Sequence, residues 1–173
     1  MKALQGGWKT TYGIFFGSHI IITLCIDAQA IGSTWYPSLL RQVVAGYCHV
    51  SGDVLMNYPH SPAWFQSLVT CEILLQLPFF GVAVRQIYKH TEEYYPRWFQ
   101  ILCILYGSHV ATTLVPILTT FWKSTHMTRT QAILTTAIYA PYLIFPLGLL
   151  YWAVQEDLAE LFLPPNKKES KVD

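Results

Sequence analysis

Two acidic residues, Asp27 and Glu72, lie inside apolar stretches of the sequence. A charge at the centre of a bilayer costs at least ~2.5–3.5 kcal/mol, so an ionisable group in a membrane helix usually faces the protein interior and serves a purpose. Two nearby carboxylates in a low dielectric cannot both ionise cheaply, so we expect this pair to share one proton and carry one negative charge. Such a site suits a basic amine on an apolar body. In the plainer alternative, the two acids only hold helices together.

The elements that must position these acids are apolar stretches about as long as the ~20 residues that cross a bilayer. There are four of them, at about 11–31, 67–88, 98–122 and 131–154. Of the 173 residues, 53% are hydrophobic and 12% are charged, which is too apolar for an ordinary soluble domain. We predict an all-α membrane protein, a four-transmembrane-helix bundle with proline-kinked helices and a ligand cavity.

The basic residues predict the orientation of the bundle. Of the 11 Lys and Arg residues, eight belong to the N-terminal segment 1–10, the end of span two with the loop that follows it, and the tail 155–173. By the positive-inside rule both termini would lie in the cytosol. The long loop 32–66 would face the lumen, and its helically spaced Leu39, Val43 and Tyr47 predict a short amphipathic helix, with an irregular lid as the alternative. The Pro-, Lys- and Glu-rich end is expected to be disordered.

Depth and periodicity predict that the two acids meet. Asp27 lies about four residues before the end of span one, and Glu72 about five residues after the start of span two. Because consecutive spans run antiparallel, both carboxylates should lie ~6–8 Å inside the lumenal edge. His19 and Thr23 precede Asp27 at four-residue spacing, and Gln76 follows Glu72 at the same spacing, so each acid belongs to a polar stripe.

Spans three and four offer polar faces to the same interior, which favours a ligand pocket over a packed core. These faces hold Tyr106, His109 and Thr113, and then Thr135, Tyr139 and Tyr142. A lone intramembrane histidine is more often a helix contact than a proton donor, so His19 and His109 are assigned a supporting role. Asp53 follows Ser51-Gly52 in the loop, where a turn or helix cap is the default interpretation.

Other classes of site find no motif in this sequence. The four cysteines show no CxxC spacing, and no HxxxH or ExxH pair exists, so we predict no metal site and no cofactor. The basic residues form no stripe interleaved with aromatics, so we predict no nucleic-acid partner.

An internal repetition is also visible. The segment Gly17-Ser18-His19-Ile20-Ile21-Ile22-Thr23-Leu24 is echoed by Gly107-Ser108-His109-Val110-Ala111-Thr112-Thr113-Leu114. The echo suggests two related helix hairpins, with chance similarity of apolar segments as the alternative. Prolines in the even-numbered spans, Pro78, Pro141 and Pro146, would kink those helices and open space between them.

Short motifs occur in order along all four spans. They include Ser18-His19-Ile20, Asp27-Ala28-Gln29-Ala30, Pro62-Ala63-Trp64-Phe65, Cys71-Glu72, Gln76-Leu77-Pro78-Phe79-Phe80, Thr112-Thr113-Leu114 and Tyr139-Ala140-Pro141-Tyr142-Leu143. Between about residues 12 and 152 the sequence thereby resembles the sigma-2 receptor (transmembrane protein 97) family of the EXPERA group, whose relatives include the emopamil-binding sterol isomerases.

The resemblance implies an endoplasmic-reticulum membrane protein linked to sterol homeostasis. It implies a homodimer that binds sterols, oxysterols or cationic amphiphilic molecules and interacts with the Niemann-Pick type C1 cholesterol transporter. It also implies that Glu72 pairs with a ligand amine, that Asp27 supports Glu72, and that Asp53 supports the site from the lumenal loop. The implied pocket residues are Gln76, Tyr106, Thr113, Tyr139 and Tyr142.

The sequence departs from the family pattern at two places. Lys171 stands third from the C-terminus, which fits a lysine-rich retrieval signal poorly, and Ile20-Ile21 replaces a proline-bearing segment.

Three functions compete for the acid pair. We expect a receptor-like binding protein without catalytic residues. The main alternative is a sterol Δ8-Δ7 isomerase, because an anionic site that accepts an amine would also stabilise a carbocation. A purely structural scaffold is the third.

Overall fold

The computed structural model describes residues 1–161. Four helical stretches are long and apolar enough to cross a bilayer, each between 27 and 31 residues. They are Gly6–Trp35, Ala63–Lys89, Arg97–Lys123 and Arg129–Ala159. Each contains one predicted span and extends beyond it, so the prediction of an all-α four-span membrane protein is confirmed. The segment expected to be disordered, 164–173, lies outside the described residues.

Each span except the third is assembled from shorter helices. In chain order the elements are α1 (Gly6–Ile22), the π-helical turn η1 (Thr23–Asp27), α2 (Gln29–Gly32), the 3-10 turn η2 (Ser33–Trp35), α3 (Ser38–Ser51), α4 (Ala63–Cys71), the π-helical turn η3 (Glu72–Gln76), α5 (Leu77–Lys89), α6 (Arg97–Lys123), α7 (Arg129–Tyr139) and α8 (Pro141–Leu161).

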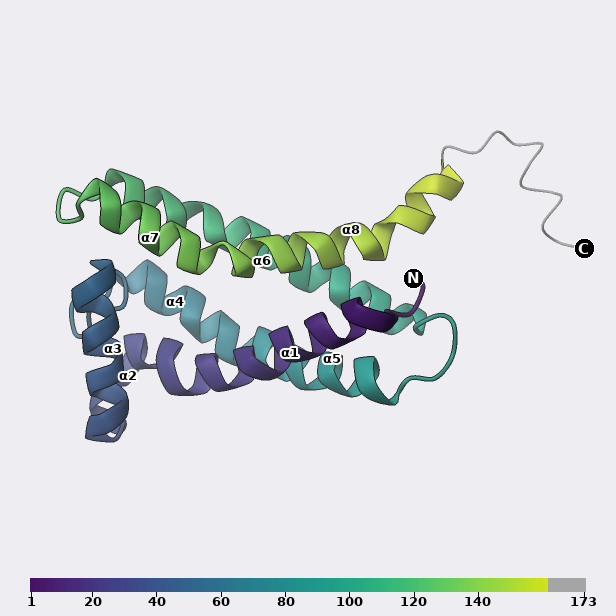
Figure 1. Cartoon of the computed structure of the whole chain (residues 1–173), viewed down its shortest axis with the longest axis horizontal. Helices are drawn as coiled ribbons and strands as arrows, with labels where there is room; N and C mark the ends of the chain where they lie inside the picture. The colour runs from purple at the N-terminus through teal and green to yellow at the C-terminus, as the bar shows by residue number, and fades with distance from the viewer. Residues whose placement is uncertain (162–173) are drawn as a thin grey trace, which may run out of the picture.

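The bundle pairs α1 with α5 and α6 with α8, and α3 lies across one end of it (Figure 1). The N-terminus and the end of α8 lie at the opposite end. The loop helix predicted from Leu39, Val43 and Tyr47 is therefore α3, and it covers the end of the bundle where spans one and two meet.

Two apolar clusters fill the bundle. The first is rich in aromatic rings and includes Phe16, Phe80 and Phe99. The second gathers Leu55 of the loop, Phe65 of α4 and Phe121 of α6 below α3.

Gly107 lets α6 approach α8 closely. A Cβ atom at this position would lie 2.8 Å from the Leu150 Cβ and 2.8 Å from the Pro146 carbonyl oxygen. Its counterpart in the internal echo, Gly17, has no such neighbour within 4 Å. The two copies of the Gly-Ser-His segment therefore pack differently, although both are helical.

Asp53 ties α3 to α7. Gly52 ends α3 with a left-handed backbone (φ +68°), and the Asp53 carboxylate, 2% exposed, follows it. One carboxylate oxygen accepts the N–H of Leu55 at 2.8 Å, and the other accepts the hydroxyls of Tyr47 at 2.8 Å and Tyr139 at 3.0 Å. Burial, together with the charge of Asp53, raises the pKa of the Tyr47 hydroxyl, which therefore keeps the proton that it donates.

We expect Gly107→Ala to destabilise the protein by about 1–3 kcal/mol, because the backbone carbonyl of Pro146 cannot move aside for a methyl group. Thermal unfolding in detergent measures the effect. Gly17→Ala is the matched control, and it should be neutral or stabilising by up to about 1 kcal/mol. Equal melting temperatures for the two variants would contradict this account of the α6–α8 contact.

We expect Asp53→Ala to cost at least about 2 kcal/mol, because it leaves several buried donors without an acceptor. Tyr47→Phe removes one donor only and should cost about 0.5–1.5 kcal/mol. As a control, Asp157→Ala breaks the exposed pair with Arg97 and should cost less than about 1 kcal/mol. A melting temperature of Asp53→Ala no lower than that of the control would show that Asp53 does not tie α3 to α7.

Candidate functional site

A pocket of about 310 Å³ lies between the two apolar clusters, at the end of the bundle covered by α3. All four spans, α3 and the loop after it contribute to its wall. Apolar side chains such as Val43, Phe65 and Leu114 make up most of that wall. Seven of the residues singled out from the sequence also line it: His19, Asp27, Glu72, Gln76, Thr113, Tyr139 and Tyr142.

The acids from spans one and two meet in this pocket, together with a histidine. Metal-ligating atoms of His19, Asp27 and Glu72 all lie within 4.8 Å of one another. The Thr23 hydroxyl donates to Glu72 Oε1 at 2.5 Å, and His19 Nε2 lies 3.6 Å from the same oxygen. The polar stripe of span one therefore faces the acid of span two.

Both acids belong to π-helical turns, which no pattern in the sequence predicted. Asp27 ends η1 and Glu72 begins η3. A π turn widens the helix by one residue and often occurs at functional sites. In η3 a local cause is Pro78, which has no N–H to give to the carbonyl of Leu74 four residues earlier.

In span one, polar side chains take up the carbonyls that the π turn leaves free. Gln29 Nε2 donates to the Cys25 carbonyl at 2.7 Å, and the Tyr36 hydroxyl donates to the Leu24 carbonyl at 2.8 Å. Every unpaired carbonyl is costly in a membrane, so these bonds stabilise the π turn that carries Asp27.

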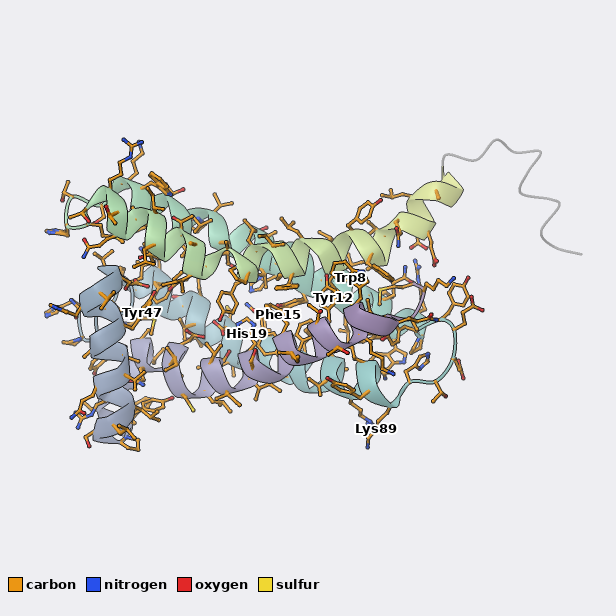
Figure 2. All side chains as sticks on the ribbon, viewed as in Figure 1. Trp8, Tyr12, Phe15, His19, Tyr47 and Lys89 are labelled. Atoms are coloured by element: carbon orange, nitrogen blue, oxygen red, sulfur yellow. The ribbon has the colours of Figure 1, made fainter. Side chains whose placement is uncertain are left out.

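The inner side of the pocket is aromatic. The His19 ring stacks on Phe80 with 4.5 Å between ring centroids and lies 4.7 Å from the Tyr142 ring. Figure 2 shows Phe15 and His19 of α1, and Tyr47 of α3, turned toward the space between the two helix pairs. The rings of His19, Phe80 and Tyr142 form the boundary between the pocket and the aromatic cluster.

Three predicted site residues, Tyr106, His109 and Asp53, do not line the pocket, and neither does Thr135, whose hydroxyl donates to the Ser51 carbonyl at 2.9 Å. Tyr106 is buried in the aromatic cluster, where its ring stacks on Phe79 at 4.6 Å and its hydroxyl has no partner among the described residues. His109 lies outside the lining, and its Nε2 is likewise buried without a described partner. Asp53 lies behind two lining residues, Tyr47 and Tyr139, and accepts hydrogen bonds from their hydroxyls.

Other lining residues were not singled out as site residues from the sequence. Val43 and Tyr47 of α3 and Met56 of the loop all face the pocket. The helical spacing of Val43 and Tyr47 could have identified them as lining residues, but such spacing indicates only which side of a helix is apolar.

The ionisable groups of the pocket are mostly acidic. Its described lining holds two carboxylates and one imidazole but no Lys or Arg. Gln76 adds a side-chain amide that makes no hydrogen bond to the described residues and so remains available to a ligand. The arrangement can accept a cationic or hydroxyl donor at its polar cluster and enclose an apolar body beside it.

Comparison with known proteins agrees with this architecture. Residues 39–153 match the family described as EXPERA (EXPanded EBP superfamily). Sigma intracellular receptor 2 of Xenopus tropicalis is 38% identical over 166 residues, which cover 91% of this chain and 90% of the relative. The Homo sapiens protein of the same name is 36% identical over 155 residues, covering 83% of this chain and 85% of the relative.

A more distant relative is efficient mitochondria targeting-associated protein 19 of Saccharomyces cerevisiae. It is 27% identical over 153 residues, which cover 79% of this chain and 91% of the relative. The family match spans most of the helical bundle, and the sigma receptors match nearly the whole chain. The resemblance found in the sequence is thereby confirmed: this multi-pass membrane protein belongs to the EXPERA family and is similar to sigma intracellular receptor 2.

Proposed function

We propose that this protein is a receptor-like binding protein whose intramembrane pocket holds a sterol or a cationic amphiphilic molecule. One observation carries the proposal. Asp27 and Glu72 meet in an otherwise apolar and aromatic pocket whose described lining contributes no Lys or Arg to neutralise them.

A protonated amine fits this site for electrostatic reasons. In a water-poor pocket an ammonium N–H donates a short, charge-assisted hydrogen bond to a carboxylate. Glu72 is the proposed partner of the amine, with Asp27 and the Thr23 hydroxyl holding it in place. The hydroxyl of a sterol would donate to the same carboxylate.

The rest of the pocket suits the body of such a molecule. A volume of about 310 Å³ lies within the ~300–1,000 Å³ range of small-molecule pockets. Apolar side chains of α4 and α6, among them Val69, Leu114 and Ile117, would pack against hydrocarbon rings. Gln76 and Thr113 offer further polar contacts along the wall.

Two lining residues support access from the lipid side. Val43 of α3 is 51% exposed and Ile138 of α7 is 39% exposed, although both face the pocket. Ile138 lies nine residues inside the fourth span, at a depth where the exposed surface meets acyl chains.

The cellular setting belongs to the same proposal. We infer an endoplasmic-reticulum membrane with both termini in the cytosol, on the basis of the basic residues and of relatives named as intracellular receptors. A role in sterol homeostasis, a homodimer and contact with the Niemann-Pick type C1 cholesterol transporter follow from the family resemblance.

Binding is favoured over sterol isomerisation by the position of the acids. Shifting a double bond requires a proton donor and a proton acceptor at separate points along the sterol. In the described lining the carboxylates and the histidine form a single cluster, with His109 outside the pocket. Rescue of a strain that lacks its Δ8-sterol isomerase would overturn this preference.

We expect Glu72→Gln to weaken binding of a fluorescent cationic amphiphile by at least about 30-fold, because breaking a buried charge pair costs about 2–5 kcal/mol. Equilibrium binding to purified protein in nanodiscs measures this. Glu93→Gln removes an exposed acid far from the pocket and should leave the affinity unchanged. An uncharged analogue of the probe should bind Glu72→Gln almost as tightly as it binds the wild type. If the amine probe binds Glu72→Gln as tightly as Glu93→Gln, the pocket assignment is wrong.

A further inference from the structure

The polar cluster holds three potential metal ligands from two spans. His19 and Asp27 belong to the first span and Glu72 to the second, and their ligating atoms lie within 4.8 Å of one another. No local motif announces this set, because its members are eight and 45 residues apart. For that reason no metal site was predicted from the sequence.

His19 has a buried ring nitrogen without a hydrogen-bond partner among the described residues. The residue is 6% exposed, and its Nδ1 is buried with no hydrogen-bond partner among the described residues. Its Nε2 approaches Glu72 Oε1 at 3.6 Å, which is longer than a hydrogen bond. The ring nitrogen that approaches Glu72 therefore makes no hydrogen bond to it, and its 3.6 Å distance from the carboxylate oxygen leaves a position for a ligand that both atoms bind.

The donor types indicate which ligand. One imidazole nitrogen and two carboxylate oxygens form a set that Zn²⁺ uses, with a fourth position left for water or substrate. Mg²⁺ and Ca²⁺ prefer oxygen ligands throughout, so the imidazole disfavours them. A dication would also neutralise two carboxylates inside the membrane, where an uncompensated charge is costly.

The geometry requires only a modest contraction. Ligands of tetrahedral zinc lie about 3.3 Å apart, and His19 Nε2 and Glu72 Oε1 are separated by 3.6 Å. Rotation of the Asp27 and Glu72 side chains can close the remaining gaps. The Thr23 hydroxyl already orients Glu72 from outside the cluster, as second-shell donors do in metal sites.

We propose that His19, Asp27 and Glu72 bind one Zn²⁺ ion, and that bound zinc competes with the amine for the pocket. The competition rests on the proposed function, because the ion and the ammonium group would use the same carboxylate. Zinc binding itself does not depend on the amine. The fourth coordination position would face the pocket, within which Gln76 has a free amide.

The test uses the full chain, purified in detergent and stripped with a chelator. Zinc affinity is measured by competition with a chromophoric zinc indicator, stoichiometry by elemental analysis, and ligand type by zinc X-ray absorption. His19→Gln is compared with His109→Gln, which changes the matching histidine of the internal echo outside the pocket. Asp27→Asn is a second site variant in case His19→Gln does not fold, as judged by its melting temperature.

We expect one zinc per chain and an imidazole signature in the wild type and in His109→Gln. His19→Gln and Asp27→Asn should weaken zinc binding at least tenfold. Zinc should raise the apparent Kd of the amine in the wild type and in His109→Gln. In His19→Gln, the apparent Kd of the amine should be nearly the same with and without zinc.

Several results would overturn the site. These are less than one zinc per chain in the wild type, equal zinc affinity of His19→Gln and His109→Gln, or equally tight binding of Ca²⁺ or Mg²⁺. Zinc binding that leaves the amine Kd unchanged would refute the competition. Amine binding without zinc binding would refute only this inference, whereas zinc binding without amine binding would refute only the proposed function.

Discussion

A carboxylate inside a bilayer-spanning helix is stable only where other groups hold its charge or its proton. Two such carboxylates, Asp27 and Glu72, meet in this bundle, and much of the structure around them serves that meeting. Spans one and two run antiparallel, so the acids reach the same depth. Each helix widens into a π turn at its acid, and Thr23 donates to the pair from one side.

The surroundings of the pair differ on its two sides. Toward the N-terminal end of α1, aromatic rings including Phe16 and Phe80 pack against one another in the interior of the bundle. Toward α3, the bundle is closed by a helix and a loop that Asp53 holds to α7. The pocket is the space between a packed aromatic core and this tethered cover.

Hydropathy predicted the four spans because length and apolar composition alone decide which segments can cross a bilayer. The meeting of Asp27 and Glu72 was predictable from their depth, because neighbouring membrane helices joined by a loop run antiparallel. Periodicity was less informative on α6. It placed Tyr106 and Thr113 on one face, but Tyr106 lies nearly two turns closer to the N-terminus of the helix and packs in the aromatic cluster instead of lining the pocket.

Other features depend on contacts that no local pattern encodes. The π turn that ends at Asp27 is stabilised by Gln29 and Tyr36, whose hydrogen bonds to the carbonyls of Cys25 and Leu24 no sequence pattern predicts. The sequence around Asp53 indicates only a turn, because its hydrogen bond with Tyr139 joins residues that are far apart in the chain. Gly17 and Gly107 sit in matching segments, yet only the second faces another helix at close range.

The exposed position of Ile138 on the pocket rim has a consequence for how affinity is measured. On the proposed route past Ile138, a molecule would dissolve first in the bilayer, so the concentration that matters would be its concentration in lipid. A probe that partitions strongly into membranes will show an apparent Kd, in terms of total concentration, that rises with the amount of lipid present. Comparisons between probes therefore require their lipid–water partition coefficients as well as their dissociation constants.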